Sequence, residues 1–116
     1  MVSDLSDSGQ NAQFGSAVLG AVDDGLLVYG EAVRHALYYS VEAKYHVKRE
    51  QIPDRIEEFH KAIGELCGYG VRVTERLIAK SLYSRLELDI PEHKEWSLVE
   101  YVEHAKKETE KRESSR

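Results

Sequence analysis

The chain has 116 residues, of which 41% are hydrophobic and 32% are charged, and its formal net charge is −5. This length and composition fit a single, mostly helical, soluble domain, and the negative charge argues against nucleic acid as a general partner. No stretch holds the roughly 20 consecutive apolar residues of a membrane helix, and we expect no secretory signal. A single cysteine, Cys67, excludes an internal disulfide. We therefore expect a cytoplasmic protein.

The two ends of the chain differ in composition from its middle. The first 15 residues are rich in Ser, Asp and Gly and contain few large apolar side chains. Such a segment buries too little apolar surface to offset the entropy of ordering it. We therefore expect residues 1–15 to form a disordered tail and residues 16–108 to form one helical domain. Residues 109–116 are polar or charged and are expected to fray into solvent.

Residues 16–46 carry apolar side chains at steps of three and four, which predicts one long, central first helix. Gly20, Gly25 and Gly30 interrupt this segment, and each costs about 1 kcal/mol relative to alanine in a helix interior. One interpretation starts the helix only at Asp24, after a loose turn. The other is that small residues permit a close helix crossing, and the unbroken apolar periodicity favours it.

Three shorter helices are predicted after this segment. Pro53 suits the first turn of a helix that ends at Gly68, since glycine tolerates the left-handed conformation at a helix C-terminus. A third helix runs from about residue 71 to residue 86 or 88. Ser97 followed by Glu100 matches a capping box at the start of the last helix. The sequence thus predicts an all-α fold, a compact bundle of about four helices.

The apolar stripes of these helices predict the core. A bundle of this size has one modest core, so a large central residue should contribute strongly to stability. We expect these residues to be buried and in mutual contact: Leu26, Val33, Leu37, Phe59, Ile63, Leu77, Ile78 and Leu82.

Six short stretches, taken together in this order, form a recognisable sequence pattern: GEAV at 30–33, ALYY at 36–39, IP at 52–53, EF at 58–59, LCGYG at 66–70 and ERLI at 75–78. They resemble a family of small archaeal helical proteins of unknown function, which is similar to output domains of archaeal signalling proteins. Cys67 departs from the family pattern, which more often has an aromatic residue there. The matching positions are mainly structural. The resemblance therefore implies a helical fold, an archaeal origin and a regulatory setting, and it implies no reaction.

No pattern predicts catalysis, a metal site or a cofactor. The histidines are scattered, whereas a zinc site usually shows two ligands at i,i+4 on one helix or close Cys/His pairs. His60 and Glu57 are spaced i,i+3, which is common on solvated faces. Asp23 and Asp24 are adjacent, so their side chains point about 100° apart and are expected to be solvated charges. Cys67 is expected to be buried and inert, since a helix C-terminus disfavours a thiolate.

Two surfaces are candidates for binding. The third helix has three basic residues at i,i+4 spacing. They could bind phosphates or the acidic surface of a partner. The other interpretation is that they pair with the acidic second helix of the same chain. Seven tyrosines and one tryptophan are many for so small a core, and both residue types are enriched in protein interfaces. The basic stripe consists of Arg72, Arg76 and Lys80, and the expected self-association patch of Leu27, Tyr38, Val41 and Trp96.

These patterns favour a non-enzymatic protein-interaction or regulatory module that forms a homodimer or binds another protein. The alternative is a nucleic-acid-binding protein that uses Arg72, Arg76 and Lys80. An enzyme has little support, because no nucleophile–base pair and no metal cluster is visible in the sequence.

Overall fold

A computed structural model describes the backbone of residues 2–93 and 95–114, with side chains from residue 12 onward. Its elements, in chain order, are α1 (Val2–Leu26), η1 (Leu27–Tyr29), α2 (Glu31–Tyr45), η2 (Arg49–Arg55), α3 (Ile56–Cys67), η3 (Gly68–Gly70), α4 (Val71–Arg85) and α5 (Leu98–Ser114). The described ranges contain no strand, so the predicted all-α class is confirmed. None of their helices is both long and apolar enough to cross a bilayer.

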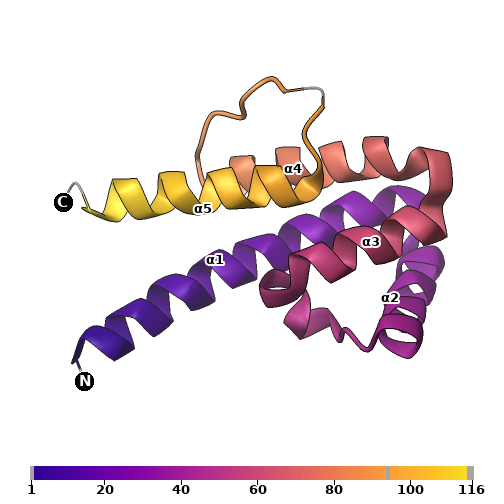
Figure 1. Cartoon of the computed structure of the whole chain (residues 1–116), viewed down its shortest axis with the longest axis horizontal. Helices are drawn as coiled ribbons and strands as arrows, with labels where there is room; N and C mark the ends of the chain where they lie inside the picture. The colour runs from indigo at the N-terminus through magenta and orange to yellow at the C-terminus, as the bar shows by residue number, and fades with distance from the viewer. Residues whose placement is uncertain (1, 94, 115–116) are drawn as a thin grey trace.

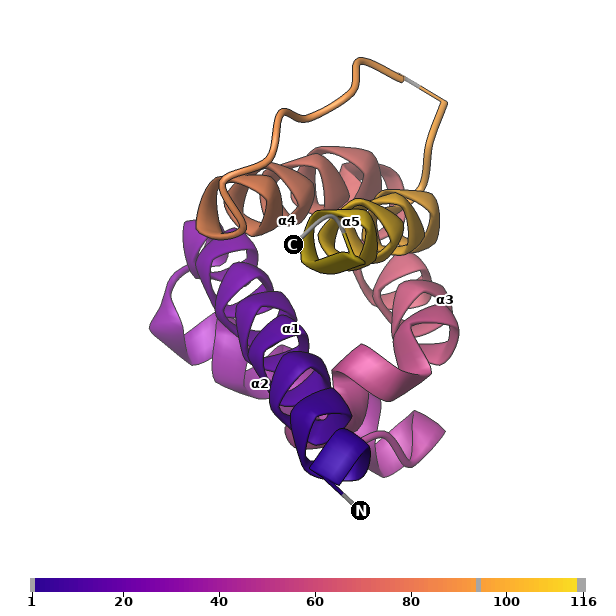
Figure 2. The same cartoon turned by 90° about the vertical axis from the view of Figure 1, so that its left-hand side faces the viewer.

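The helices surround one core. Figure 2, which looks along the molecule, shows α1, α3, α4 and α5 arranged around a common centre. α2 lies at one end, beside α3 and the C-terminal part of α1 (Figure 1). The largest fully buried apolar side chains come from all five α-helices, η2 and the segment before it: Val18, Val22, Leu26, Val41, Val47, Ile52, Phe59, Ile63, Ile78, Leu82, Tyr83 and Leu98.

Gly25 allows α1 and α4 to approach closely. A Cβ atom at this position would overlap Ile78 Cγ1 and would lie only 3.1 Å from the Ile78 backbone nitrogen. Since both helices are fixed by the surrounding core, only glycine fits here without moving α4. The interpretation that small residues permit a close helix crossing is confirmed at this position.

The prediction of one long helix over residues 16–46 is wrong in its start and its continuity. The backbone is helical from Val2, so residue 16 lies inside α1. At Gly30, φ is 96° and ψ is 158°, a conformation that side-chain-bearing residues rarely adopt, and the helix breaks there. The expected end is confirmed, because α2 ends at Tyr45 and His46 takes the left-handed conformation.

Pro53, which was predicted in the first turn of the second helix, lies inside η2 instead, and α3 begins only at Ile56. The remaining helix boundaries agree with the sequence signals. Gly68 ends α3 with a positive φ of 59°. α4 begins at Val71 and ends at Arg85, close to the predicted limits. Ser97 N donates a hydrogen bond of 2.9 Å to Glu100 Oε1, which is one of the two bonds of a capping box.

The expected N-terminal tail overlaps α1. Phe14 is half-buried against the core, and Gly15 lies beside the Pro53 ring. Residues 14 and 15 therefore contact the domain that we expected to begin at residue 16. Residue 1 and the side chains of residues 2–11 lie outside the described part of the chain.

The expected C-terminal tail overlaps α5, which continues to Ser114. Arg112 donates two hydrogen bonds of 2.9 Å, to the backbone oxygens of Leu86 and Glu87. Residues 115 and 116 lie outside the described part of the chain. The mobility of both end segments in solution stays a prediction.

Most of the predicted core is confirmed. Five of its residues are buried, namely Leu26, Phe59, Ile63, Ile78 and Leu82. Leu37 and Leu77 are half-buried. The prediction that Val33 is buried is wrong, because 45% of its surface is exposed. The break at Gly30 explains this error, because it redirects the chain so that α2 does not continue the buried stripe of α1.

Candidate functional site

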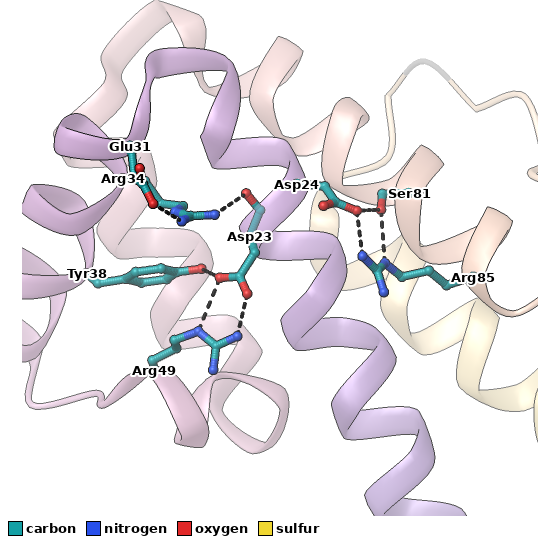
Figure 3. Close-up of polar contacts among 8 residues, drawn as sticks. All are labelled: Asp23, Asp24, Glu31, Arg34, Tyr38, Arg49, Ser81 and Arg85. Atoms are coloured by element: carbon teal, nitrogen blue, oxygen red, sulfur yellow. Dashed lines mark hydrogen bonds and ion pairs between the residues drawn. The ribbon is translucent and has the colours of Figure 1, made fainter.

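Two adjacent carboxylates near the end of α1 bind different neighbours, as Figure 3 shows. Asp23 Oδ1 accepts hydrogen bonds from the Tyr38 hydroxyl (2.5 Å) and from Arg49 Nε (3.1 Å). Asp23 Oδ2 accepts another from Arg49 Nη2 (2.5 Å). The Arg49 guanidinium also lies 5.9 Å from the centre of the Tyr38 ring. Asp23 thus ties α1 to α2 and η2.

These contacts fix the protonation of the Asp23 cluster. Burial by itself would raise the pKa of Asp23, but the hydrogen bonds from Arg49 and Tyr38 outweigh it, and the pKa lies below its ordinary value. Burial, and then the hydrogen bond to Asp23, raises the pKa of Tyr38, so the hydroxyl stays protonated and donates. Both carboxylate oxygens are hydrogen-bonded within the fold, which indicates a structural role.

Asp24 points away from Asp23 and toward α4 (Figure 3). Its Oδ2 atom accepts hydrogen bonds from Ser81 Oγ (2.7 Å) and Arg85 Nη2 (2.8 Å). The bonds from Arg85 and then Ser81 lower the pKa of Asp24. The expectation of solvated charges is therefore wrong for Asp23, which is 27% exposed, but not for Asp24, which is 51% exposed. The expected divergence of the two side chains is confirmed.

A cleft of about 380 Å³ opens between α3, α4 and α5, a volume within the usual range for small-molecule sites. Its lining combines groups that bind polar atoms with apolar and aromatic surface. The residues that matter for its chemistry are His60, Arg72, Val73, Glu75, Arg76 and Trp96.

Glu75 is the buried charged group of this cleft, with only 5% of its surface exposed. Its Oε1 atom accepts a hydrogen bond of 3.2 Å from the backbone N–H of Leu98, the first residue of α5. Its Oε2 atom is bonded to His60 Nδ1. The other ring nitrogen, His60 Nε2, has no hydrogen-bond partner among the described residues. Glu75 thus joins α3, α4 and α5.

Arg72 and Arg76 line the same cleft from successive turns of α4. Neither forms a hydrogen bond or ion pair with any described residue, and the same is true of Lys80. We expected this stripe to pair with the acidic helix predicted second, which is α3. Within the described ranges it does not. The stripe is divided, because Lys80 is exposed outside the lining of the cleft.

Trp96 forms the aromatic side of the cleft and is the only tryptophan in the chain. Its ring stacks on His93 at 4.2 Å between centroids and meets Tyr101 edge-on at 5.2 Å. The Tyr101 hydroxyl donates a hydrogen bond of 2.7 Å to the His93 backbone oxygen. These contacts hold the indole in place beside α5.

The four residues expected to form a self-association patch do not lie on one free surface. Val41 is only 1% exposed and belongs to the core. Tyr38 is half-buried and bonded to Asp23, and Trp96 lines the cleft. Leu27 alone among them is an exposed apolar residue. The cause is again the break at Gly30, since α2 packs the face with Val41 inward.

Other exposed apolar side chains lie on η1, at the end of α3 and on η3. The Tyr29 hydroxyl is bonded to Thr74 Oγ1 and lies next to Gly70, so the end of α1 meets the turn between α3 and α4 (Figure 1). We call this surface the apolar end, and it consists of Leu27, Val28, Tyr29, Leu66 and Tyr69.

Sequence reasoning missed the pairing of His60 with Glu75. We considered Glu57 as the neighbour of His60, because only that pair is close in sequence. A usable signal was present, since Glu75 lies at helical spacing between Val71 and Ile78, on the apolar stripe of α4. A charged residue at a core position needs a buried partner.

Among the described residues, no three His, Cys, Asp or Glu side chains are grouped as a metal site would require. Cys67 is half-buried, so the prediction that it is buried is wrong. Its partial burial raises the pKa of the thiol, which agrees in direction with an unreactive cysteine. Comparison with protein-family models, with curated proteins and with solved structures finds no match to this chain. The resemblance to an archaeal helical family stays a prediction.

Proposed function

We propose that this chain is a non-enzymatic interaction module of the cytoplasm that forms a homodimer through its apolar end. The observation that supports this proposal is the exposure of Leu27, Val28 and Tyr69 on neighbouring elements, with Val28 63% exposed. Contiguous exposed apolar surface on a small domain marks interaction sites. The regulatory setting implied by the archaeal resemblance is part of the same proposal.

A second copy of the chain is the occupant that we favour. None of the five residues of the apolar end is charged, and a two-fold interface uses one self-complementary patch twice. Burying an exposed valine or leucine side chain contributes about 1.5–3 kcal/mol, whereas association costs an estimated 4–15 kcal/mol in lost freedom. Several such side chains from each copy are therefore needed, and a weak, micromolar dimer is expected.

Sedimentation equilibrium over a range of protein concentrations tests the proposal. We expect a monomer–dimer equilibrium that is shifted to monomer by Val28→Glu or Tyr69→Glu, because each would bury an unpaired charge. Tyr39→Glu is the matched control, since Tyr39 is exposed on α2 outside the apolar end. A monomer mass at hundreds of micromolar, or a dimer that resists both variants, would refute the proposal.

Nucleic-acid binding is the second candidate, favoured by the three basic residues of α4 that lack partners among the described residues. Affinity for a duplex or single-stranded probe should then fall steeply with salt, because binding releases counterions. Arg72→Glu combined with Arg76→Glu should abolish it in fluorescence anisotropy. The absence of binding at low salt would remove this candidate.

A further inference from the structure

We propose that the cleft between α3, α4 and α5 binds a small organic anion, whose acidic group pairs with Arg72 and Arg76 while its apolar body lies against Trp96. The juxtaposition that carries this proposal is two arginines without partners among the described residues, beside a positioned histidine and an aromatic ring, in one cleft. It is independent of the proposed dimer, because none of these residues belongs to the apolar end.

The charges of the cleft favour an anion. Arg72 and Arg76 project from the same face of α4, spaced i,i+4, so both guanidinium groups can reach one carboxylate or phosphate. Glu75, the acidic residue among them, is already occupied on both oxygens by Leu98 N–H and His60. Both of its oxygens are therefore occupied within the fold, while the two arginine side chains, which have no partner among the described residues, are available to a ligand.

The lining holds two arginines and two glutamates, and the glutamates have contacts of their own within the fold. Glu95 also lines the cleft, but its side chain is 78% exposed and lies 3.8 Å from His93 Nδ1. Exposed charges interact weakly because water screens them. His60 presents Nε2 as a further polar contact, with its ring orientation fixed by Glu75.

The apolar lining indicates what the rest of the ligand must be. Val71, Val73 and Trp96 line the cleft together with the two arginines. Inorganic phosphate would leave this surface in water, whereas a ligand with a flat or aliphatic body would cover it. Binding sites of this volume commonly combine a few convergent polar groups with such a lining. The acid itself is either a carboxylate or a phosphate monoester, since both pair with arginine through two parallel hydrogen bonds.

The fluorescence of Trp96, the only tryptophan, reports occupancy directly. The full chain is titrated with phenyl phosphate, benzoate, inorganic phosphate and the neutral analogue benzyl alcohol. We expect saturable changes with phenyl phosphate or benzoate, and the stronger of the two identifies the acid. Inorganic phosphate should bind more weakly, because it lacks the apolar body, and benzyl alcohol should not saturate, because it lacks the charge.

The variant Arg72→Gln with Arg76→Gln should weaken binding roughly tenfold or more, because it removes two charge-assisted hydrogen bonds. Lys80→Gln is the control, since it also replaces a cationic side chain of α4 by glutamine but lies outside the cleft, and it should leave the affinity within about twofold. Circular dichroism checks that both variants keep their helices. Calorimetry on the same ligands confirms that the fluorescence change reflects binding.

Three outcomes overturn the proposal. They are the absence of saturation by either organic anion, equal binding of benzyl alcohol, and equal weakening by Lys80→Gln and by the double arginine variant. The last outcome would indicate a general charge effect of α4, as nucleic-acid binding predicts. The monomeric variant Val28→Glu should bind the anion normally, so failure of the dimer and failure of this site are distinguishable.

Discussion

Asp23 and Asp24 both accept hydrogen bonds from an arginine, but their surroundings differ. The Asp23 side chain is 27% exposed and Asp24 is 51% exposed. Asp23 accepts three hydrogen bonds that join α1 to α2 and η2, whereas the two bonds of Asp24 lie at the surface and are screened by water. We therefore expect Asp23 to contribute more than Asp24 to the free energy of unfolding.

We expect Asp23→Asn to lower the free energy of unfolding by about 1–3 kcal/mol at neutral pH, since hydrogen bonds to charged groups are the stronger kind. Asp24→Asn, the matched control, should cost less than about 1 kcal/mol. Urea denaturation of both variants measures the difference. Equal losses would mean that the Arg49 and Tyr38 contacts are no stronger than the surface contacts of Arg85.

The same contacts predict a dependence of stability on pH. The pKa of Asp23 is lower in the folded chain than its ordinary value of 3.8, so the unfolded chain binds more protons in the window between the two values. Stability from Asp23 is therefore complete above that window and is lost as the pH falls through it. Denaturant titrations from neutral pH down to this window should show a shallower decline in Asp23→Asn. An identical decline would contradict the lowered pKa.

At the residue scale, the sequence predicted the orientation of individual side chains better than which side chains bind each other. The divergence of Asp23 and Asp24 follows from helix geometry alone and was predictable. Their partners Arg49 and Arg85 are 26 and 61 positions away along the chain. Which distant side chain meets a carboxylate depends on how the helices pack, and no local spacing contains that information.

Among the contacts between helices, the close approach of α1 and α4 places the strictest limit on the sequence. Ile78 lies against Gly25, and its backbone nitrogen would be 3.1 Å from any Cβ placed there. A side chain at this position must push the two helices apart, and their shared core would lose contacts along the crossing. The crossing therefore places an upper limit on residue size at position 25.

We expect Gly25→Ala to lower the free energy of unfolding by about 1–3 kcal/mol because it overpacks this crossing, although alanine is the better helix former. Gly64→Ala is the matched control. Gly64 lies inside α3 with nothing within 4 Å of an added Cβ, so alanine should stabilise the chain by about 0.5–1 kcal/mol there. Thermal and urea denaturation compare the two. A stabilising Gly25→Ala would show that α4 moves away at little cost.

Helix ends were predictable where a local residue dictates them. Gly68 marks the end of α3, because it tolerates a positive φ. Pro53 marks no boundary, since it lies inside η2. Gly30 also takes a positive φ, but the apolar periodicity continues across it and suggested an unbroken helix. The break is imposed by packing, since η1 lies against η3 and α4.

On the scale of the whole molecule, the sequence predicted which residues are buried but not which faces meet. The periodicity of each helix identified Phe59, Ile63 and Ile78 correctly. The cleft was not predictable in the same way, since its groups come from α3, α4 and α5 and meet only in the folded chain. The same holds for the apolar end, which joins η1 to η3.

Phe59 tests whether these helices form one cooperative core. Its ring is fully buried, and it belongs to the same cluster as Val22 of α1, Leu82 of α4 and Val102 of α5. Phe59→Ala should lower the free energy of unfolding by about 3–5 kcal/mol, since removing a buried aromatic ring leaves a cavity that the helices cannot fill.

Phe14→Ala is the control for Phe59→Ala, because Phe14 is only half-buried at the edge of the same cluster, and its loss should be clearly smaller. Far-ultraviolet circular dichroism and Trp96 fluorescence should report the same unfolding midpoint in the wild type, since one shared core unfolds as a unit. A loss below about 1 kcal/mol for Phe59→Ala would place the ring outside the centre. Separate midpoints would show that α5, next to Trp96, unfolds independently of the other helices.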